Sequence, residues 1–174
     1  MTTYDMAPTD APSTRSRTHT WQPRPDTTPE ILRMSGLEIL QAAMKGALPA
    51  ASIMSTLGFR LTEVSEGLAV FEGDPGDHLL NPMGTVHGGF LATLLDSALG
   101  SAVMTRLPAG TMYTTVQLGV HMIRPVLSDT PTLRCEGRAL HVGRTTATAE
   151  ARIVDTLTGK LYAHGTTTCA VLRS

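Results

Sequence analysis

Apolar residues follow two different spacings along this chain, and the change between them divides the chain into elements. From Gly88 to Ala102 nearly every position is apolar or small, and Asp96 carries the only charge. A helix that is apolar on nearly every side is normally buried within a domain. The sequence therefore predicts a buried central helix, which begins after the loop at residues 81–87 and ends before Pro108.

Outside this helix, apolar residues mostly alternate with polar ones, the pattern of a half-buried strand. Six segments read as strands, at residues 57–64, 68–72, 115–122, 132–139, 146–154 and 161–171. Short connections with Gly67, Gly143 and Gly159 separate several of them. Short turns between alternating strands predict an antiparallel meander.

The first fifty residues differ from the rest. Residues 1–29 are rich in Thr and Pro and poor in apolar side chains, so we predict a flexible tail. A covering helix is expected from Pro29 to about Leu48, because Thr28 can cap it and Pro29 suits the first helical position. The predicted organisation is a tail at 1–29, this helix at 30–49 and one domain at 50–174.

A single antiparallel sheet of about six strands wrapped around one apolar helix would bury both elements, so the predicted class is α+β. The many Ala and Gly positions would let such a sheet curl around the helix. A sheet of this size leaves edges, and a free edge strand readily pairs with another chain. Dimerisation through sheet edges or faces is therefore expected.

Composition adds few constraints. The 174 residues suit one domain, and the formal net charge is −1. No cluster of Lys and Arg stands out and aromatic residues make up 4%, which argues against a nucleic-acid partner. No apolar run reaches transmembrane length and no signal peptide is evident, so we expect a soluble, cytoplasmic protein without membrane contact.

The cysteines and histidines give no clear site of their own. Cys135 and Cys169 are expected to be reduced thiols, although a disulfide between neighbouring strands stays an alternative. The histidines show no metal-ligand spacing, so no metal is expected.

Asp96 is the first candidate for chemistry, because ionised side chains are rarely buried without a partner. A lone Asp in a helix is more often a solvated surface residue, but here its neighbours are nearly all apolar. Residues three and four apart share a helix face, so Asp96 lies on a small, partly polar stripe. That stripe leaves room for a ligand, a neighbouring subunit or both.

Gly88 and Gly89 begin the helix, where backbone N–H groups lack helical partners and the helix dipole favours negative charge. Such amides can stabilise an oxyanion developing from a carbonyl, while His87 could merely cap the helix. Asp96 lies about 12 Å further along by helical rise, too far to act on the same carbonyl within one chain. A two-fold partner that brings its own Asp96 would remove this difficulty.

Taken together, Asn81, His87-Gly88-Gly89 and Asp96 resemble the active-site segment of hotdog-fold acyl-CoA thioesterases. Among these enzymes, the chain resembles the phenylacetate-degradation (PaaI-like) type, which belongs to the 4-hydroxybenzoyl-CoA thioesterase superfamily. A strand ending in Arg124-Pro125, the turn His141-Val142-Gly143-Arg144 and the hairpin at residues 155–160 resemble further parts of the family. The resemblance covers about residues 50–173.

The resemblance implies a hotdog fold that works as a dimer, usually as a dimer of dimers (a homotetramer), with two composite sites per dimer. The amide at Gly88 would polarise the thioester carbonyl, and Asp96 of the partner would be nucleophile or general base. Asn81 would lie near the thioester or the water, and His87 would position the substrate or the Gly88 amide.

Coenzyme A would be bound as part of the substrate and not as a cofactor, so no cofactor is expected. The positions that match its binding surface are Gly89, Arg124, Arg144, Thr145 and Thr146. The chain departs from some relatives at Gly100, where they carry a hydroxyl that holds the water. Two alternatives therefore stay open, a non-catalytic acyl-CoA sensor and a hotdog hydratase or dehydratase.

Overall fold

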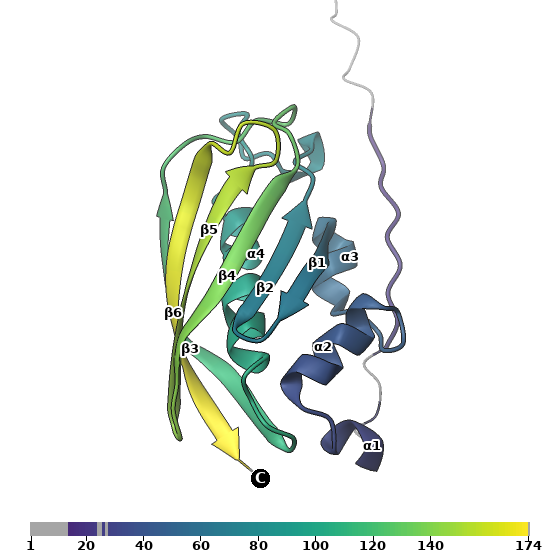
Figure 1. Ribbon diagram of the computed structural model, residues 1–174. Coiled ribbons are helices and arrows are strands. Elements are labelled where there is room, and N and C mark those ends of the chain that lie inside the picture. Colours follow the sequence, from purple (N-terminus) through teal and green to yellow (C-terminus); the bar gives the residue numbers. More distant parts are fainter. Residues whose placement is uncertain (1–13, 24–25, 27, 174) are drawn as a thin grey trace, which may run out of the picture.

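The computed structural model describes residues 14–23, 26 and 28–173 (Figure 1). The helices are α1 (Pro29–Leu32), α2 (Gly36–Met44), α3 (Ser52–Leu57), the short 3-10 helix η1 (Asp77–Leu79) and α4 (Gly88–Met104). The strands are β1 (Phe59–Ser65), β2 (Leu68–Gly73), β3 (Thr111–Met122), β4 (Leu133–Val142), β5 (Thr146–Asp155) and β6 (Leu161–Arg173).

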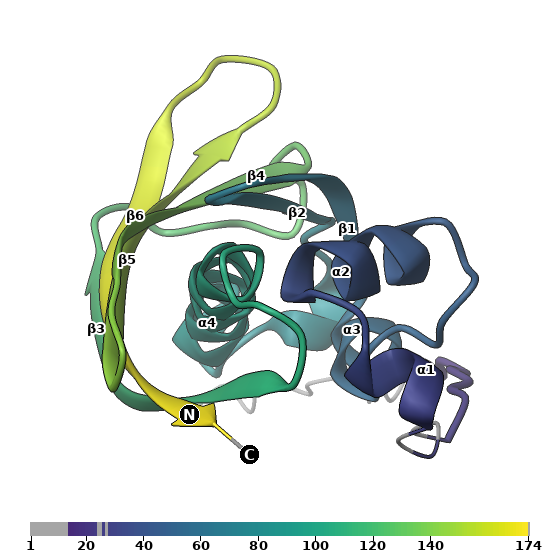
Figure 2. The ribbon, with the colours of Figure 1, turned by 60° about the horizontal axis from the view of Figure 1, so that its bottom comes forward.

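One antiparallel six-stranded sheet, in the order β1-β2-β4-β5-β6-β3, curves around α4. Figure 2 looks toward one end of α4 and shows the helix inside the curve of the sheet, with α1, α2 and α3 beside it. The predicted α+β arrangement, a sheet wrapped around a central helix, is confirmed.

The predicted meander is wrong at one strand. β4, β5 and β6 follow one another as neighbours, but β3 pairs with β6 and not with β4. After β2 the chain crosses the concave face as α4 and emerges at the far edge of the sheet, where it forms β3. Residues 123–132 then return to the middle, a connection too long for a tight hairpin, so β3 is left as an edge strand.

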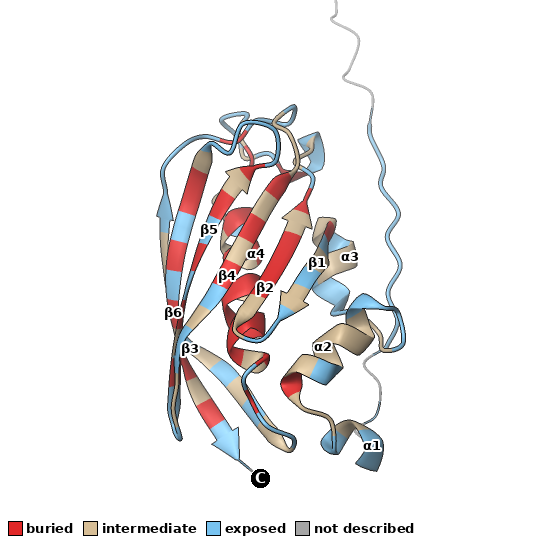
Figure 3. Cartoon of the chain, in the orientation of Figure 1, coloured by how far each residue is buried: buried red, intermediate tan, exposed pale blue. Residues whose placement is uncertain are grey.

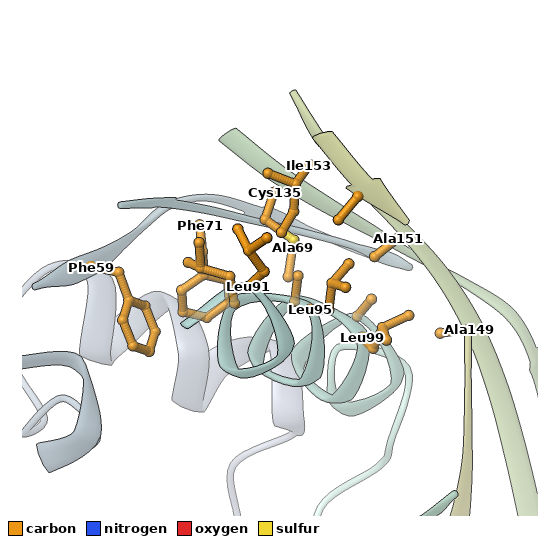
Figure 4. Close-up of a cluster of buried hydrophobic side chains, with 14 of the residues drawn as sticks. Phe59, Ala69, Phe71, Leu91, Leu95, Leu99, Cys135, Ala149, Ala151 and Ile153 are labelled. Carbon is orange, nitrogen blue, oxygen red and sulfur yellow. The ribbon is translucent and has the colours of Figure 1, made fainter. Parts of the chain in front are cut away.

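The core lies between α4 and the sheet. Leu94, Leu95, Ala98 and Leu99 are fully buried. The sheet contributes buried side chains from several strands, among them Phe71, Cys135 and Ile153 (Figure 4). Figure 3 shows the same division, with buried positions concentrated on α4 and the central strands and exposed positions on α1. Burial of this apolar surface is the main stabilising term of the fold.

The N-terminal helix predicted from Pro29 to Leu48 is wrong as a single element. The cap by Thr28 is confirmed, because its hydroxyl accepts from the Ile31 N–H at 3.4 Å, but α1 ends after four residues. Ser35 then starts α2 with a capping box, in which the Glu38 carboxylate accepts from the Ser35 N–H at 2.7 Å. A strong second cap inside the segment divides the helix in two. α3 was not predicted.

The start of α2 is attached to the end of α4. The Gly36 N–H donates to the Leu107 carbonyl at 3.0 Å. A Cβ on Gly36 would overlap the Met104 carbonyl oxygen, so glycine is needed for this close approach. α2 therefore lies against α4 at a defined place.

Other predictions for the termini and cysteines have mixed outcomes. The flexible tail predicted at 1–29 falls partly on residues 1–13, 24, 25 and 27, which lie outside the described residues. Residues 14–23 are exposed and form no helix or strand.

Cys135 and Cys169 are both free thiols. Among the described residues, no helix is long and apolar enough to cross a membrane.

Candidate active site

Asn81 closes the loop that precedes α4. Its side-chain oxygen accepts from the backbone N–H groups of Met83 and Thr85 at 2.9 and 3.2 Å. Its side-chain nitrogen donates to the Thr85 hydroxyl at 2.9 Å. Asn81 therefore shapes the loop that leads to the helix, and its predicted contact with the thioester or water stays a prediction.

His87 is the N-cap of α4. Its Nδ1 accepts from the Gly89 N–H at 2.9 Å, so this amide is already engaged. Within the described part of the chain, the Gly88 N–H has no hydrogen-bond acceptor. A Cβ on Gly88 would lie 2.5 Å from the methyl carbon of Met122, which places that flexible side chain of β3 beside the helix start. Of the two glycine amides predicted to face a ligand, Gly88 is the one left available.

Asp96 lies eight positions further along α4 and is partly buried. The hydroxyl of Thr115, on β3, donates to its Oδ1 at 3.0 Å. The second carboxylate oxygen stays available to a substrate or water. A carboxylate with one oxygen held by a hydroxyl is oriented without losing its ability to accept a proton or attack a carbonyl.

Tyr113, two residues before Thr115, brings a second hydroxyl close to the same face of α4. A Cβ on Gly100 would lie 2.5 Å from its hydroxyl oxygen, so the missing side chain makes room for the phenol. Burial raises the pKa of Tyr113, and the charges of Cys169 and Asp96 act in the same direction. The phenol therefore stays protonated and can act as a neutral hydrogen-bond donor.

A cavity of about 310 Å³ opens beside the carboxylate. Asp96, Ser97, Ser101 and Tyr113 line one part of it, and apolar side chains line the rest. Asp96 thus lies where a polar patch meets an apolar space, an arrangement typical of small-molecule sites.

The residues predicted for coenzyme A binding divide into two groups at opposite ends of the sheet. Arg124 follows β3 and its guanidinium donates to the Leu161 carbonyl at the start of β6. The turn with Arg144, Thr145 and Thr146 lies near the other end of β6, where Thr146 pairs with Ala170. The two groups are separated along β6 by the distance from Ala163, which pairs with Met122, to Ala170. These positions are seven residues apart, or about 23 Å along the strand.

These two groups are therefore not brought together within one chain. Arg124, Arg144, Thr145 and Thr146 are all exposed, and their predicted contacts with coenzyme A stay a prediction.

Sequence reasoning missed Thr115 and Tyr113. Both lie in or next to a segment correctly predicted as a strand, but nothing local connects them to a carboxylate 17 to 19 positions earlier. It also missed the part of the cavity that comes from α2 and α3. Within the described residues, no group of three or more His, Cys, Asp or Glu side chains could hold a metal ion.

Comparison with known proteins agrees with this fold. Residues 83–161, which include Gly88, Asp96 and Thr115, match the model of the thioesterase superfamily. The protein VNG_1336C of Halobacterium salinarum, which is named as an esterase, is 33% identical over 107 residues, covering 59% of this chain and 69% of that protein.

Two solved structures are similar as well. A phenylacetic acid degradation-related protein of Ralstonia eutropha is 28% identical with a TM-score of 0.67, over 75% of this chain and 97% of that one. The PaaI protein of E. coli is 22% identical with a TM-score of 0.68, over 79% of this chain and 94% of that one, a likeness of fold alone.

A curved antiparallel sheet around one central helix is the hotdog fold, and the sequence matches place the chain among the hotdog-fold hydrolases that act on thioesters. Within that class, the chain belongs to the thioesterase superfamily, and the predicted resemblance to PaaI-like proteins is confirmed.

Proposed function

We propose that this protein hydrolyses acyl-CoA thioesters to free acid and coenzyme A. The single observation that carries the proposal is the position of Asp96, oriented by Thr115 in a cavity that has a polar part and an apolar wall. The family gives the thioester hydrolase reaction; acyl-CoA as substrate and the roles of single residues are our inference. The cytoplasm stays the predicted location.

In the proposed reaction, the Gly88 N–H donates to the thioester carbonyl oxygen and stabilises the negative charge that develops there. One such donor contributes on the order of 3 kcal/mol to the transition state. Asp96 either attacks the carbonyl carbon, giving an anhydride that water then opens, or accepts a proton from the attacking water. In both routes the carbon–sulfur bond breaks and coenzyme A leaves as the thiol.

His87 and Thr115 act through their neighbours. His87 holds the start of α4 by accepting from the Gly89 N–H, so that the Gly88 N–H is the amide proposed to bind the carbonyl. Thr115 holds the carboxylate at one oxygen. Asn81 shapes the loop that precedes α4 and thus the position of His87.

We also propose that the working site is shared between two subunits of a homodimer. Gly88 and Asp96 are about 12 Å apart by helical rise, too far for one carbonyl. β3 is an edge strand of 12 residues, and Met112, Val116 and Met122 on it are 52%, 60% and 52% exposed. A long edge strand with exposed apolar side chains favours pairing with another chain.

Pairing of two β3 edges about a two-fold axis would bring unlike ends of the two sheets together. Arg124 of one subunit would then approach the Arg144 end of the other, which supports a shared coenzyme A surface. Two such dimers are expected to associate further, as a dimer of dimers.

The proposed reaction is tested by following thiol release from a panel of acyl-CoA thioesters with the wild type and Asp96→Asn. Asparagine keeps the shape but removes the base and nucleophile, so we expect kcat/KM to fall about 10²- to 10⁴-fold. Asp129→Asn, an exposed carboxylate away from the cavity, is the matched control. Wild-type activity in Asp96→Asn would refute the assignment.

Other outcomes point to the alternatives. Tight binding of acyl-CoA by the wild type without thiol release would support a sensor, and water addition to enoyl-CoA would support a hydratase.

The shared site is tested by hybrid dimers of Asp96→Asn and Gly88→Pro subunits. Proline suits the first helical position and removes the N–H donor, and its ring requires the flexible Met122 side chain to shift. Each variant alone should be inactive, whereas a hybrid dimer would keep one intact site made from Gly88 of one subunit and Asp96 of the other. In a refolded equal mixture, half of the dimers are hybrids with one intact site of two, so about a quarter of wild-type activity should return. No recovery in dimers shown to be mixed would contradict a shared site.

A further inference from the structure

The cavity beside Asp96 has an apolar part that the proposed reaction has not yet used. Its wall comes from Leu40, Ala43 and Met44 of α2, Met54 of α3, Leu61 of β1 and Phe71 of β2. In Figure 2, α2 and α3 lie next to α4 on the side of β1, and residues of both line the cavity.

The α2 and α3 part of this wall lies outside the residues matched by the family model, which begins at residue 83. Its position is nevertheless defined, because the Gly36 N–H donates to Leu107 and the capping box of Ser35 and Glu38 fixes where α2 begins. This part of the wall therefore depends on how the N-terminal region packs against the end of α4.

The chemistry of the lining limits what can enter. Asp96 is the only charged side chain among the lining residues, and no Lys or Arg accompanies it. The phosphates of coenzyme A would find no counter-charge there, and burying them unpaired would be costly. An uncharged, mostly apolar group fits this lining.

We infer that this cavity binds the acyl group of the thioester, and that it selects medium-length apolar groups. The inference rests on the proposed function. A water molecule takes about 30 Å³ in the liquid and a methylene group is of similar size, so 310 Å³ accommodates on the order of ten carbon atoms. Acyl groups of about six to ten carbons therefore fill the cavity, and much longer ones extend beyond its apolar wall.

The direction of binding follows from the position of Asp96. The carboxylate and the cavity belong to the same chain, whereas the carbonyl oxygen is held by the Gly88 amide of the partner subunit. The acyl group therefore enters the subunit that supplies the carboxylate, with the coenzyme A part left outside. Residues of α2 then determine chain-length preference without touching the reacting atoms.

The test measures kcat/KM on a series of linear acyl-CoA thioesters from four to sixteen carbons. Ala43→Leu adds three carbons to the wall and keeps helix propensity nearly unchanged. We expect activity on decanoyl-CoA to fall about tenfold or more, and activity on butanoyl-CoA to stay within about twofold. Ala42→Leu, the adjacent α2 residue that does not line the cavity, is the matched control and should leave the profile unchanged.

A second variant tests the opposite change. Met54→Ala enlarges the space, so the preferred chain should lengthen by about two to four carbons. The inference is overturned if neither variant changes the chain-length profile, or if Ala42→Leu changes it as much as Ala43→Leu does.

Failure of the proposed function would look different from failure of this inference. If the wild type released no thiol from any substrate, the hydrolase proposal would fail. The role of the cavity is tested separately by binding. Calorimetry measures the affinity for decanoyl-CoA of two proteins that both carry Asp96→Asn, one otherwise wild type and one with Ala43→Leu as well. A tenfold weaker affinity in Ala43→Leu supports it, and equal affinities refute it.

Discussion

One side of α4 faces the sheet, and the other faces α2 and the edge strand β3. On the sheet side, Leu91, Leu95 and Leu99 are almost completely buried (Figure 4). On the other side, Asp96 and Ser97 are only partly buried and line a cavity. The same helix thus supplies the core with one side and the proposed site with the other.

The two sides obey different physical requirements. The sheet side needs apolar side chains of matching volume, since close packing there determines stability. The other side carries Asp96, whose carboxylate accepts a hydrogen bond from Thr115 and lies beside space for solvent or ligand. Changes on the first side should therefore act on folding, and changes on the second on catalysis.

The largest expected effect on the sheet side comes from Leu95→Ala. Leu95 is fully buried, so its truncation should lower the free energy of unfolding by about 2–5 kcal/mol. Under conditions in which the variant is still folded, kcat/KM should stay close to that of the wild type. Urea unfolding and thiol release measure the two quantities, and a loss of stability below about 1 kcal/mol would contradict the division between the two sides.

A smaller effect, on catalysis alone, is expected from Thr115→Val. Valine has nearly the shape of threonine but cannot donate to Asp96, so the carboxylate loses its orientation. We expect kcat/KM to fall about tenfold, equivalent to about 1.4 kcal/mol. Thr114→Val, at the adjacent exposed position of β3, should have little effect; equal losses in both variants would show a general disturbance of the strand.

The smallest effect concerns alkaline pH. The raised pKa of Tyr113 means that the phenol keeps its proton in the folded state, while the unfolded chain releases it above pH about 10. The folded state then binds more protons, so stability falls as pH rises past that value, by at most about 1.4 kcal/mol per pH unit. Tyr113→Phe should lessen this fall, and parallel stability curves from pH 8 to 11 would contradict it.

Much of the fold could be predicted from the sequence, because its signals are local. The apolar run after Gly88 predicts α4, and alternation predicts the strands, since both patterns repeat within a few residues. The N-terminal helices were less predictable. Several positions there suit a helix, and only the capping box of Ser35 and Glu38 divides them into α1 and α2.

Part of the candidate site could be predicted for the same reason. His87, Gly88 and Asp96 lie close together in one segment, and their positions on a single helix follow from its geometry. Thr115 and Tyr113 could not be connected to Asp96 in this way, because their contacts with α4 depend on where β3 lies in the sheet.

The sequence by itself determined that a lone carboxylate would sit on a buried helix, about 12 Å from the amides at its start. Only the tertiary structure decided what surrounds that carboxylate. Because β3 pairs with β6 at the far edge, its Thr115 hydroxyl reaches Asp96 and its other side stays open to a second chain. Because α2 packs against the end of α4, the space beside Asp96 becomes a partly enclosed cavity with one apolar wall.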